Sequence, residues 1–181
     1  MIKISEFKRK MTETYNITIS KAQKLLLAFP GMIMYCNGPP GSLLEEFVKP
    51  FKSCGYVVVS VESLRRICRS GEEAFIMGLH KRIAEALEKD VPIIIYGYLD
   101  LGTLDLVFTG TYRHFRYIYI YPSAAGLSGR VNEKLLGSSG VAAYCGKAKP
   151  SVKVILKKHS EIYKTHLEQY EKMLVVLEDD A

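Results

Sequence analysis

The fold depends on one stretch of sequence, Met32-Ile33-Met34-Tyr35-Cys36-Asn37-Gly38-Pro39-Pro40-Gly41-Ser42-Leu43-Leu44-Glu45-Glu46-Phe47. An apolar run of strand length ends in a Gly/Pro turn, and the turn leads directly into residues with helical spacing. Ser42 and Glu45 have the spacing of a capping box, and Phe47 and Phe51 share one helical face. We therefore predict a strand, a tight turn and a helix, in that order.

The rest of the chain alternates strand and helix patterns. Runs of β-branched and apolar residues predict strands at 32–36, 56–61, 93–96, 115–121 and 173–177. Capping residues and apolar periodicity predict helices at 21–28, 63–69, 72–89 and 151–170. Pro50 should stop or distort the helix that begins at Ser42. In the last helix, the expected core contacts are Ile155, Ile162, Leu167 and Tyr170.

This alternation predicts an α/β fold, a three-layer sandwich around a mostly parallel five-stranded sheet. We expect a single domain over residues 1–181, with residues 1–30 as a helical extension. Residues 122–150 are rich in Gly, Ser and Ala, so they should form a long mobile loop with one helical piece near 130–136. Ligands of such sheets bind beyond the carboxyl ends of the strands.

Composition limits the classes of function. The formal net charge of +6 suggests an anionic partner. The longest apolar runs are too short to cross a bilayer, so we expect a cytoplasmic protein without membrane contact. The four cysteines and four histidines lack the spacing of a metal site, so no metal is expected.

Over residues 31–178 the chain resembles P-loop nucleotide and polynucleotide kinases. Such kinases have Gly-Pro-Pro-Gly-Ser-Gly-Lys-Ser after the first strand and Ser-x-Asp-Ser-Leu-Arg-Arg after the second. This chain has Gly38-Pro39-Pro40-Gly41-Ser42 and then Ser60-Val61-Glu62-Ser63-Leu64-Arg65-Arg66. The resemblance implies a nucleotide loop at 38–42, a lid at 122–150 that carries Arg130, and Glu62 in the place of the kinase Asp that takes the acceptor proton.

The chain departs from this family where the family handles phosphate. Leu43 replaces the second Gly of the Walker A loop, Leu44 replaces the Lys, and Glu45 replaces the Ser/Thr that ligates Mg²⁺. The third strand ends in Tyr96 rather than near a carboxylate, and Asp100 comes a few residues late. We therefore do not expect ordinary phosphoryl transfer from Mg-ATP.

Basic residues form two groups whose role the sequence leaves open. The first is Arg65, Arg66 and Arg69, and the second is Lys147, Lys149, Lys153 and Lys157. Both could contact phosphate or nucleic acid. The first could equally be a solvated helix face with ion pairs to Glu72 or Glu73, and Glu62 could cap the following helix.

Alternate tyrosines at 117, 119 and 121 could stack on bases, but we favour a packed strand face.

Two hypotheses follow. The first is a non-catalytic, kinase-like binding or assembly module with no cofactor, whose basic face contacts nucleic acid or a protein partner. The alternative is a divergent nucleoside, nucleotide or polynucleotide kinase that uses ATP and Mg²⁺. In that case phosphates would lie on the backbone N–H groups of Gly41 to Leu44, and Lys49 or an arginine would supply the missing positive charge.

Overall fold

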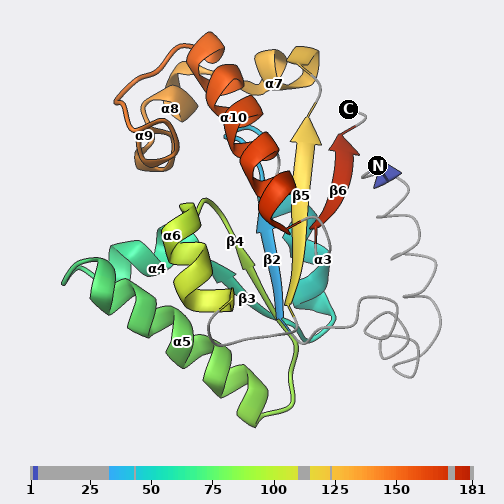
Figure 1. Cartoon of the computed structure of the whole chain (residues 1–181), viewed down its shortest axis with the longest axis vertical. Coiled ribbons are helices and arrows are strands. Elements are labelled where there is room, and N and C mark those ends of the chain that lie inside the picture. The colour runs from blue at the N-terminus through green and yellow to red at the C-terminus, as the bar shows by residue number, and fades with distance from the viewer. Residues whose placement is uncertain are drawn as a thin grey trace.

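The computed structural model describes residues 2–3, 33–42, 44–109, 115–122, 124–170 and 174–179. Its strands are β1 (Ile2–Lys3), β2 (Ile33–Asn37), β3 (Val57–Ser60), β4 (Ile93–Tyr96), β5 (Phe115–Pro122) and β6 (Leu174–Asp179). They form one sheet in the order β1-β6-β5-β2-β4-β3, and every pair of neighbours is parallel (Figure 1). The prediction of a parallel α/β sheet is confirmed. The count of five strands is not, because the described residues include a short sixth strand, β1, on β6.

The helices of the described residues are α3 (Leu44–Ser53), α4 (Val61–Ile67), α5 (Glu72–Glu88), α6 (Leu101–Leu104), the π-helical η1 (Asp105–Thr109), α7 (Ala124–Arg130), α8 (Glu133–Leu136), α9 (Ser139–Cys145) and α10 (Val152–Tyr170). The helix predicted at 21–28 lies outside the described residues. Pro50 does not end α3, which continues to Ser53. Phe47 and Phe51 flank this proline and are buried against the sheet, and this packing offsets the roughly 3 kcal/mol cost of an interior proline.

The prediction of a long loop at 122–150 with one helical piece near 130–136 holds only in part, because α8 lies within 130–136 but the segment also contains the short helices α7 and α9. Side chains cap two of these three helices: Asn132 accepts from Leu135 N–H at the start of α8, and Ser138 accepts from Val141 N–H at the start of α9. Gly146, at φ +63°, follows α9 in the left-handed conformation that glycine adopts without strain. We call α7, α8 and α9 the lid helices.

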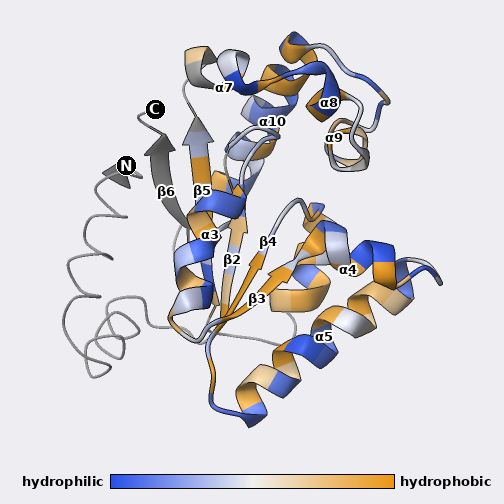
Figure 2. Ribbon diagram, turned by 180° about the vertical axis from the view of Figure 1, so that it is seen from behind, coloured by the Kyte–Doolittle hydropathy of each residue, from blue (hydrophilic) through white to orange (hydrophobic). Residues whose placement is uncertain are grey.

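Strands β2, β3 and β4 are largely apolar (Figure 2), and all of β2 and most of β4 are buried. Alternate residues of β2 point to opposite sides. Ile33 and Tyr35 join the core under α5, η1 and α10, whereas Met34 and Cys36 join the core under α3. Helices therefore cover both faces, and the carboxyl ends of the strands meet at the edge that faces the lid helices (Figure 1).

The tyrosines of β5 form a packed face, as we favoured. Tyr117 and Tyr119 are fully buried, and their hydroxyls pair with Nδ1 of His166 and His159 on α10. The predicted core contact of Leu167 is wrong, since this side chain is 38% exposed. The core-facing residues of α10 are Ile155, His159, Ile162, His166 and Tyr170.

Candidate functional site

The loop at 38–42 is a tight turn at the carboxyl end of the central strand β2. Asn37 is fully buried, and its Oδ1 accepts from Gly38 N–H at 2.8 Å while its Nδ2 donates to the Tyr117 hydroxyl at 3.1 Å. Ser42 N–H donates to the Pro39 carbonyl at 3.0 Å. Gly41 has φ +88°, a conformation that strains any side chain. The sequence of this loop thus fixes the turn.

Ser42 does not cap α3 as the capping-box spacing predicted. Its side chain is buried, and its Oγ makes no hydrogen bond with a described residue. The Oγ lies beside Gly38 instead: a Cβ at Gly38 would fall 2.5 Å from it. The turn thus directs the hydroxyl back toward the start of the loop.

A cavity of about 980 Å³ lies at this edge of the sheet. Its walls come from the loop, the first turn of α3, the β3–α4 corner, the end of β4 and the lid helices. The predicted site residues that line it are Gly38, Pro39, Pro40, Gly41, Ser42, Glu62, Arg65, Arg66 and Arg130. Arg69 and the four predicted lysines are not among its lining residues. The structure thus brings the loop and the two arginines of α4 together, but not the second basic group.

Apolar side chains of the lid pack against the loop. A Cβ on Gly41 would meet Leu127 at 3.2 Å, Leu135 at 3.6 Å and Val131 at 3.7 Å. Leu127 is fully buried in a small core that Val131 and Leu135 also join. We call Leu127, Val131 and Leu135 the lid cluster. Sequence reasoning missed this contact, because the Gly, Ser and Ala content of residues 122–150 predicts a long mobile loop.

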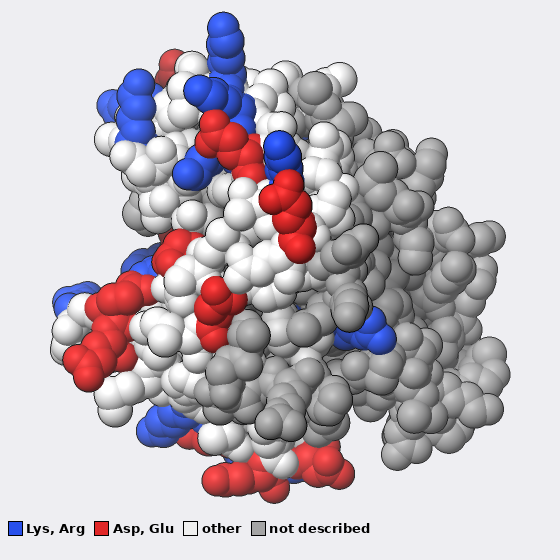
Figure 3. Space-filling view, viewed as in Figure 1, with Lys and Arg blue, Asp and Glu red and all other residues white. Residues whose placement is uncertain are grey.

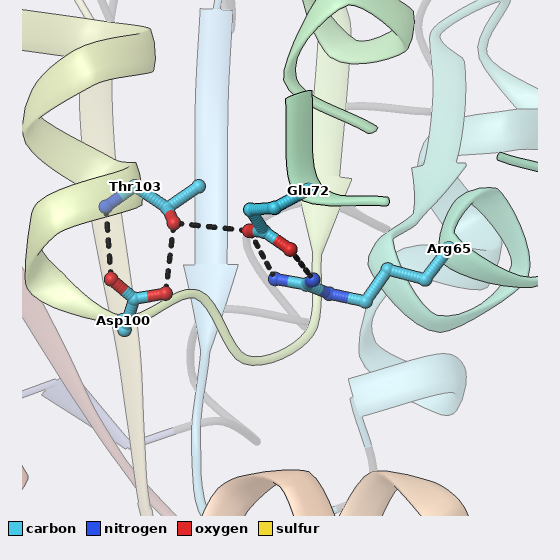
Figure 4. A network of polar contacts seen from close by, with 4 residues as sticks. All are labelled: Arg65, Glu72, Asp100 and Thr103. Carbon is cyan, nitrogen blue, oxygen red and sulfur yellow. Dashed lines mark hydrogen bonds and ion pairs between the residues drawn. The ribbon is translucent and has the colours of Figure 1, made fainter. Parts of the chain in front are cut away.

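The Arg65 side chain is held by two residues of α5, Glu72 and Phe75. Its guanidinium makes a two-point ion pair with the Glu72 carboxylate and lies 4.0 Å from the centre of the Phe75 ring (Figure 4). Glu72 also contacts the Thr103 hydroxyl at 3.2 Å, and that hydroxyl lies 2.8 Å from Asp100 Oδ2. Of the two roles that the sequence leaves open for Arg65, the structure thus shows the ion pair with Glu72.

Asp100 does not stand in for the missing kinase carboxylate. It is the N-cap of α6, where its Oδ1 accepts from Thr103 N–H at 3.0 Å, and it is not a cavity-lining residue. Burial alone would raise its pKa, but the hydrogen bonds from Thr103 bring that pKa below its ordinary value. The end of β4 instead presents Tyr96 and Tyr98 to the cavity.

Glu62 does not cap α4, since the N-cap is Ser60, whose side chain accepts from Ser63 N–H. Glu62 lies in the first turn of α4 and pairs with Arg66 at 3.4 Å. Its Oε2 is also close to α9, because a Cβ on Gly140 would lie 3.1 Å from it. Burial raises the pKa of the Tyr96 hydroxyl, a hydrogen bond with Ser60 opposes this, and the carboxylates of Glu45 and Glu62 raise it further.

Acidic and basic side chains are interspersed on the face drawn in Figure 3. Arg66 pairs with Glu62 and Lys157 with Glu161, while Arg69 Nε donates to the Arg66 carbonyl at 3.4 Å. These exposed pairs are weak individually. Nucleic-acid binding through either basic group stays a prediction.

The chain has the fold of P-loop kinases. No protein-family model matches the sequence, and no curated protein matches it significantly. Among solved structures, the chain is similar to a gluconokinase from Sinorhizobium meliloti 1021, with a TM-score of 0.50 and 15% identity over 84% of this chain and 85% of that one. It is also similar to a shikimate kinase from Acinetobacter baumannii, determined in complex with shikimate, with a TM-score of 0.48 and 12% identity over 87% of each chain. At these identities the likeness shows the fold alone.

Within the described residues, no helix is long and apolar enough to span a membrane.

Proposed function

We propose that this chain is a non-catalytic P-loop kinase-like domain that binds a small ligand in the cavity at the edge of its sheet. One observation carries the proposal: the lid cluster packs on Gly41, where a kinase loop would wrap phosphate. A polyphosphate in this loop would lie against these apolar side chains. Tyr96, Tyr98 and Tyr144 also line the cavity, so its wall extends beyond the loop.

Charge at the start of α3 supports the same proposal. Leu44 is half-buried against the core beneath α3 and carries no charge. Glu45 and Glu46 are exposed in the first turn and line the cavity. They suit the positive end of the helix dipole, but they repel a polyphosphate that approaches the same N–H groups.

Mg-ATP is therefore expected to leave the melting temperature of the wild-type chain unchanged. Nucleotide at 100 times its Kd would add about 2.7 kcal/mol to the free energy of unfolding, which thermal scanning detects easily. The double variant Leu44→Lys/Glu45→Ser, which restores the cation and hydroxyl, should gain a Mg-ATP-dependent rise. The matched control is Leu106→Lys/Glu88→Ser, which changes two exposed residues outside the cavity. A rise in the wild type that Leu44→Glu abolishes would contradict the proposal.

The alternative of a divergent kinase has one observation in its favour. The Ser42 hydroxyl is buried on the cavity wall without a described hydrogen-bond partner. In this alternative Glu62 would accept the acceptor proton and Arg130 would supply positive charge, with ATP and Mg²⁺ as cofactors. Turnover of ATP by the wild-type chain would favour it.

The second basic group supports a separate nucleic-acid proposal, which the cavity does not require. Lys147, Lys149 and Lys153 are exposed and have no ion pair with a described residue. If they bind phosphates, the affinity for a labelled single-stranded oligonucleotide should fall steeply with salt, and Lys149→Glu/Lys153→Glu should reduce the salt slope by about two. Lys81→Glu/Lys89→Glu, two exposed lysines on the far part of α5 and just after it, is the control. Binding that is independent of salt, or equal effects of the two pairs, would rule out this contact.

A further inference from the structure

We infer that His166 controls the loop at 38–42 through a directional chain of buried hydrogen bonds, so that protonation of His166 releases the Gly38 N–H. The chain runs from His166 on α10 through Tyr117 on β5 to Asn37 on β2, which is next to the loop. Gly38 lines the cavity, whereas His166 is not one of its lining residues. A proton taken up beneath α10 would thus change one wall of the cavity, whatever ligand the cavity takes.

Burial makes this chain a closed set of donors and acceptors. Asn37 and Tyr117 are fully buried, and His166 is 2% exposed. Asn37 Oδ1 lies 2.8 Å from the nitrogen of Gly38, Asn37 Nδ2 lies 3.1 Å from the Tyr117 hydroxyl, and that hydroxyl is bonded to Nδ1 of His166. A buried donor that loses its partner is costly, so the four groups must keep consistent directions.

The backbone N–H of Gly38 fixes the direction of the whole chain. An N–H can only donate, so the Asn37 atom that faces Gly38 is Oδ1. The Nδ2 of the same amide then donates to the Tyr117 oxygen. The single hydroxyl proton of Tyr117 is left to donate to Nδ1 of His166. The chain thereby assigns His166 the neutral tautomer that carries its proton on Nε2.

Protonation of Nδ1 reverses the direction at this end of the chain. An imidazolium donates from both ring nitrogens, so Tyr117 must accept from it and needs another acceptor for its own proton. Rotation of the Asn37 amide by a half-turn supplies that acceptor, because Oδ1 then faces Tyr117. Nδ2 then faces the Gly38 N–H, donor against donor, and the bond that holds the start of the loop is lost.

The loop holds a second acceptor beside Gly38. The Ser42 hydroxyl is 1% exposed and makes no hydrogen bond with a described residue, and a Cβ at Gly38 would lie 2.5 Å from its Oγ. An N–H released by Asn37 therefore has an oxygen nearby in the same loop. Two alternative partners for one N–H give the loop the two arrangements that a switch requires.

The titratable groups around the His166 ring come from three elements. The rings of Tyr117 on β5 and Tyr170 on α10 have centroids 5.5 Å and 6.2 Å from that of His166, and Asp105 on η1 acts through its charge. Burial lowers the pKa of His166 to about 4, and Asp105 opposes part of this shift. Lowering the pH toward 4 therefore moves the loop from the arrangement bonded to Asn37 to the released one.

NMR of the imidazole nitrogens of the wild-type chain tests the direction without a substitution. At pH 7 we expect His166 to carry a proton on Nε2 and none on Nδ1. Between pH 7 and 4.5, the amide proton resonance of Gly38 should shift in step with the titration of the His166 ring. A proton on Nδ1 at pH 7, or a Gly38 amide that does not follow the ring, would overturn the inference.

His166→Gln and His159→Gln form a matched pair for the same measurement. Each replaces a buried histidine of α10 whose Nδ1 pairs with a tyrosine of β5, but only the partner of His166 is bonded to Asn37. His166→Gln should abolish the pH-dependent shift of Gly38, and His159→Gln should leave it in place. Equal effects of the two variants would mean that the shift reports acid destabilisation of the whole chain, which would reject the link.

Asn37→Asp tests the chain from its other end. A carboxylate has no proton to donate, so Tyr117 should donate to it and accept from His166. The pKa of His166 should then rise by at least about one pH unit, while that of His159 stays unchanged. An unchanged His166 pKa in the folded variant would contradict the inference, and if the variant does not fold, the wild-type tautomer decides.

Discussion

Lowering the pH from 7 to about 4.5 should sharply reduce the free energy of unfolding of this protein. His159 and His166 are 4% and 2% exposed, and burial lowers the pKa of each from 6.5 to about 4, although Asp105 partly opposes the shift at His166. In the native state at pH 7 both rings are neutral, and their Nδ1 atoms are hydrogen-bonded to the hydroxyls of Tyr119 and Tyr117. A protonated ring is a donor at both nitrogens and carries a charge that burial disfavours.

The direction follows from proton linkage. Between pH 6.5 and 4 the unfolded chain binds more protons at these histidines than the native chain, so stability is complete above pH 6.5 and is lost as the pH falls toward 4. Each histidine contributes about 1.4 kcal/mol per pH unit in this window, and the full shifts correspond to about 3 kcal/mol each. Urea unfolding at pH 7, 6, 5 and 4.5 measures the loss.

The double variant His159→Gln/His166→Gln is the control for this prediction. Glutamine can still accept from a tyrosine hydroxyl but does not titrate. We expect it to be less stable than the wild type at pH 7, with a much flatter dependence between pH 6.5 and 5. A wild-type stability that is equal at pH 7 and pH 5 would show that neither ring is buried in its neutral form.

Replacing Asn37 by Ala should cost about 2–4 kcal/mol of stability. The Asn37 side chain is fully buried and pairs with both Gly38 N–H and the Tyr117 hydroxyl. Its removal leaves the buried Gly38 N–H without its partner and removes one donor to the Tyr117 hydroxyl, which keeps its contact with His166; an unsatisfied buried group costs about 1–3 kcal/mol. Urea unfolding at pH 7 measures the loss.

Ser42→Ala is the matched control for Asn37→Ala. Ser42 belongs to the same loop and is equally buried, but its hydroxyl makes no hydrogen bond with a described residue. The substitution should cost less than about 1 kcal/mol. Equal losses in the two variants would mean that the hydrogen bonds of Asn37 do not hold the loop.

The sheet was predictable because its strands are dense in β-branched and apolar residues. The segment at 93–96 was predicted with its observed bounds, and 56–61 and 115–121 within two residues. The helical spacing of α10 indicates a buried face, but two residues of that face, His159 and His166, are polar. The apolar neighbour Leu167 was therefore predicted as a core residue instead. A polar side chain becomes a core residue only when a partner such as Tyr117 or Tyr119 reaches it, and that partner lies on a distant strand.

The candidate site was predictable where local motifs define it, but not where it depends on tertiary contacts. The position of the loop at 38–42 and its place beside Glu62 and Arg65 follow from local motifs and the order of elements. The pairing of Arg65 with Glu72, the capping role of Asp100 and the contact of the lid cluster with Gly41 depend on tertiary packing. Asn132 and Ser138 are helix-start signals that could have revealed the lid helices.

The central claim is that the loop at 38–42 no longer holds nucleotide phosphates. Crystals of the wild-type chain grown with millimolar Mg²⁺ and a non-hydrolysable ATP analogue test it most directly. We expect no phosphate density on the backbone N–H groups of the loop, with Leu127, Val131 and Leu135 still against Gly41. Triphosphate density in the loop, with the lid cluster displaced, would contradict the account.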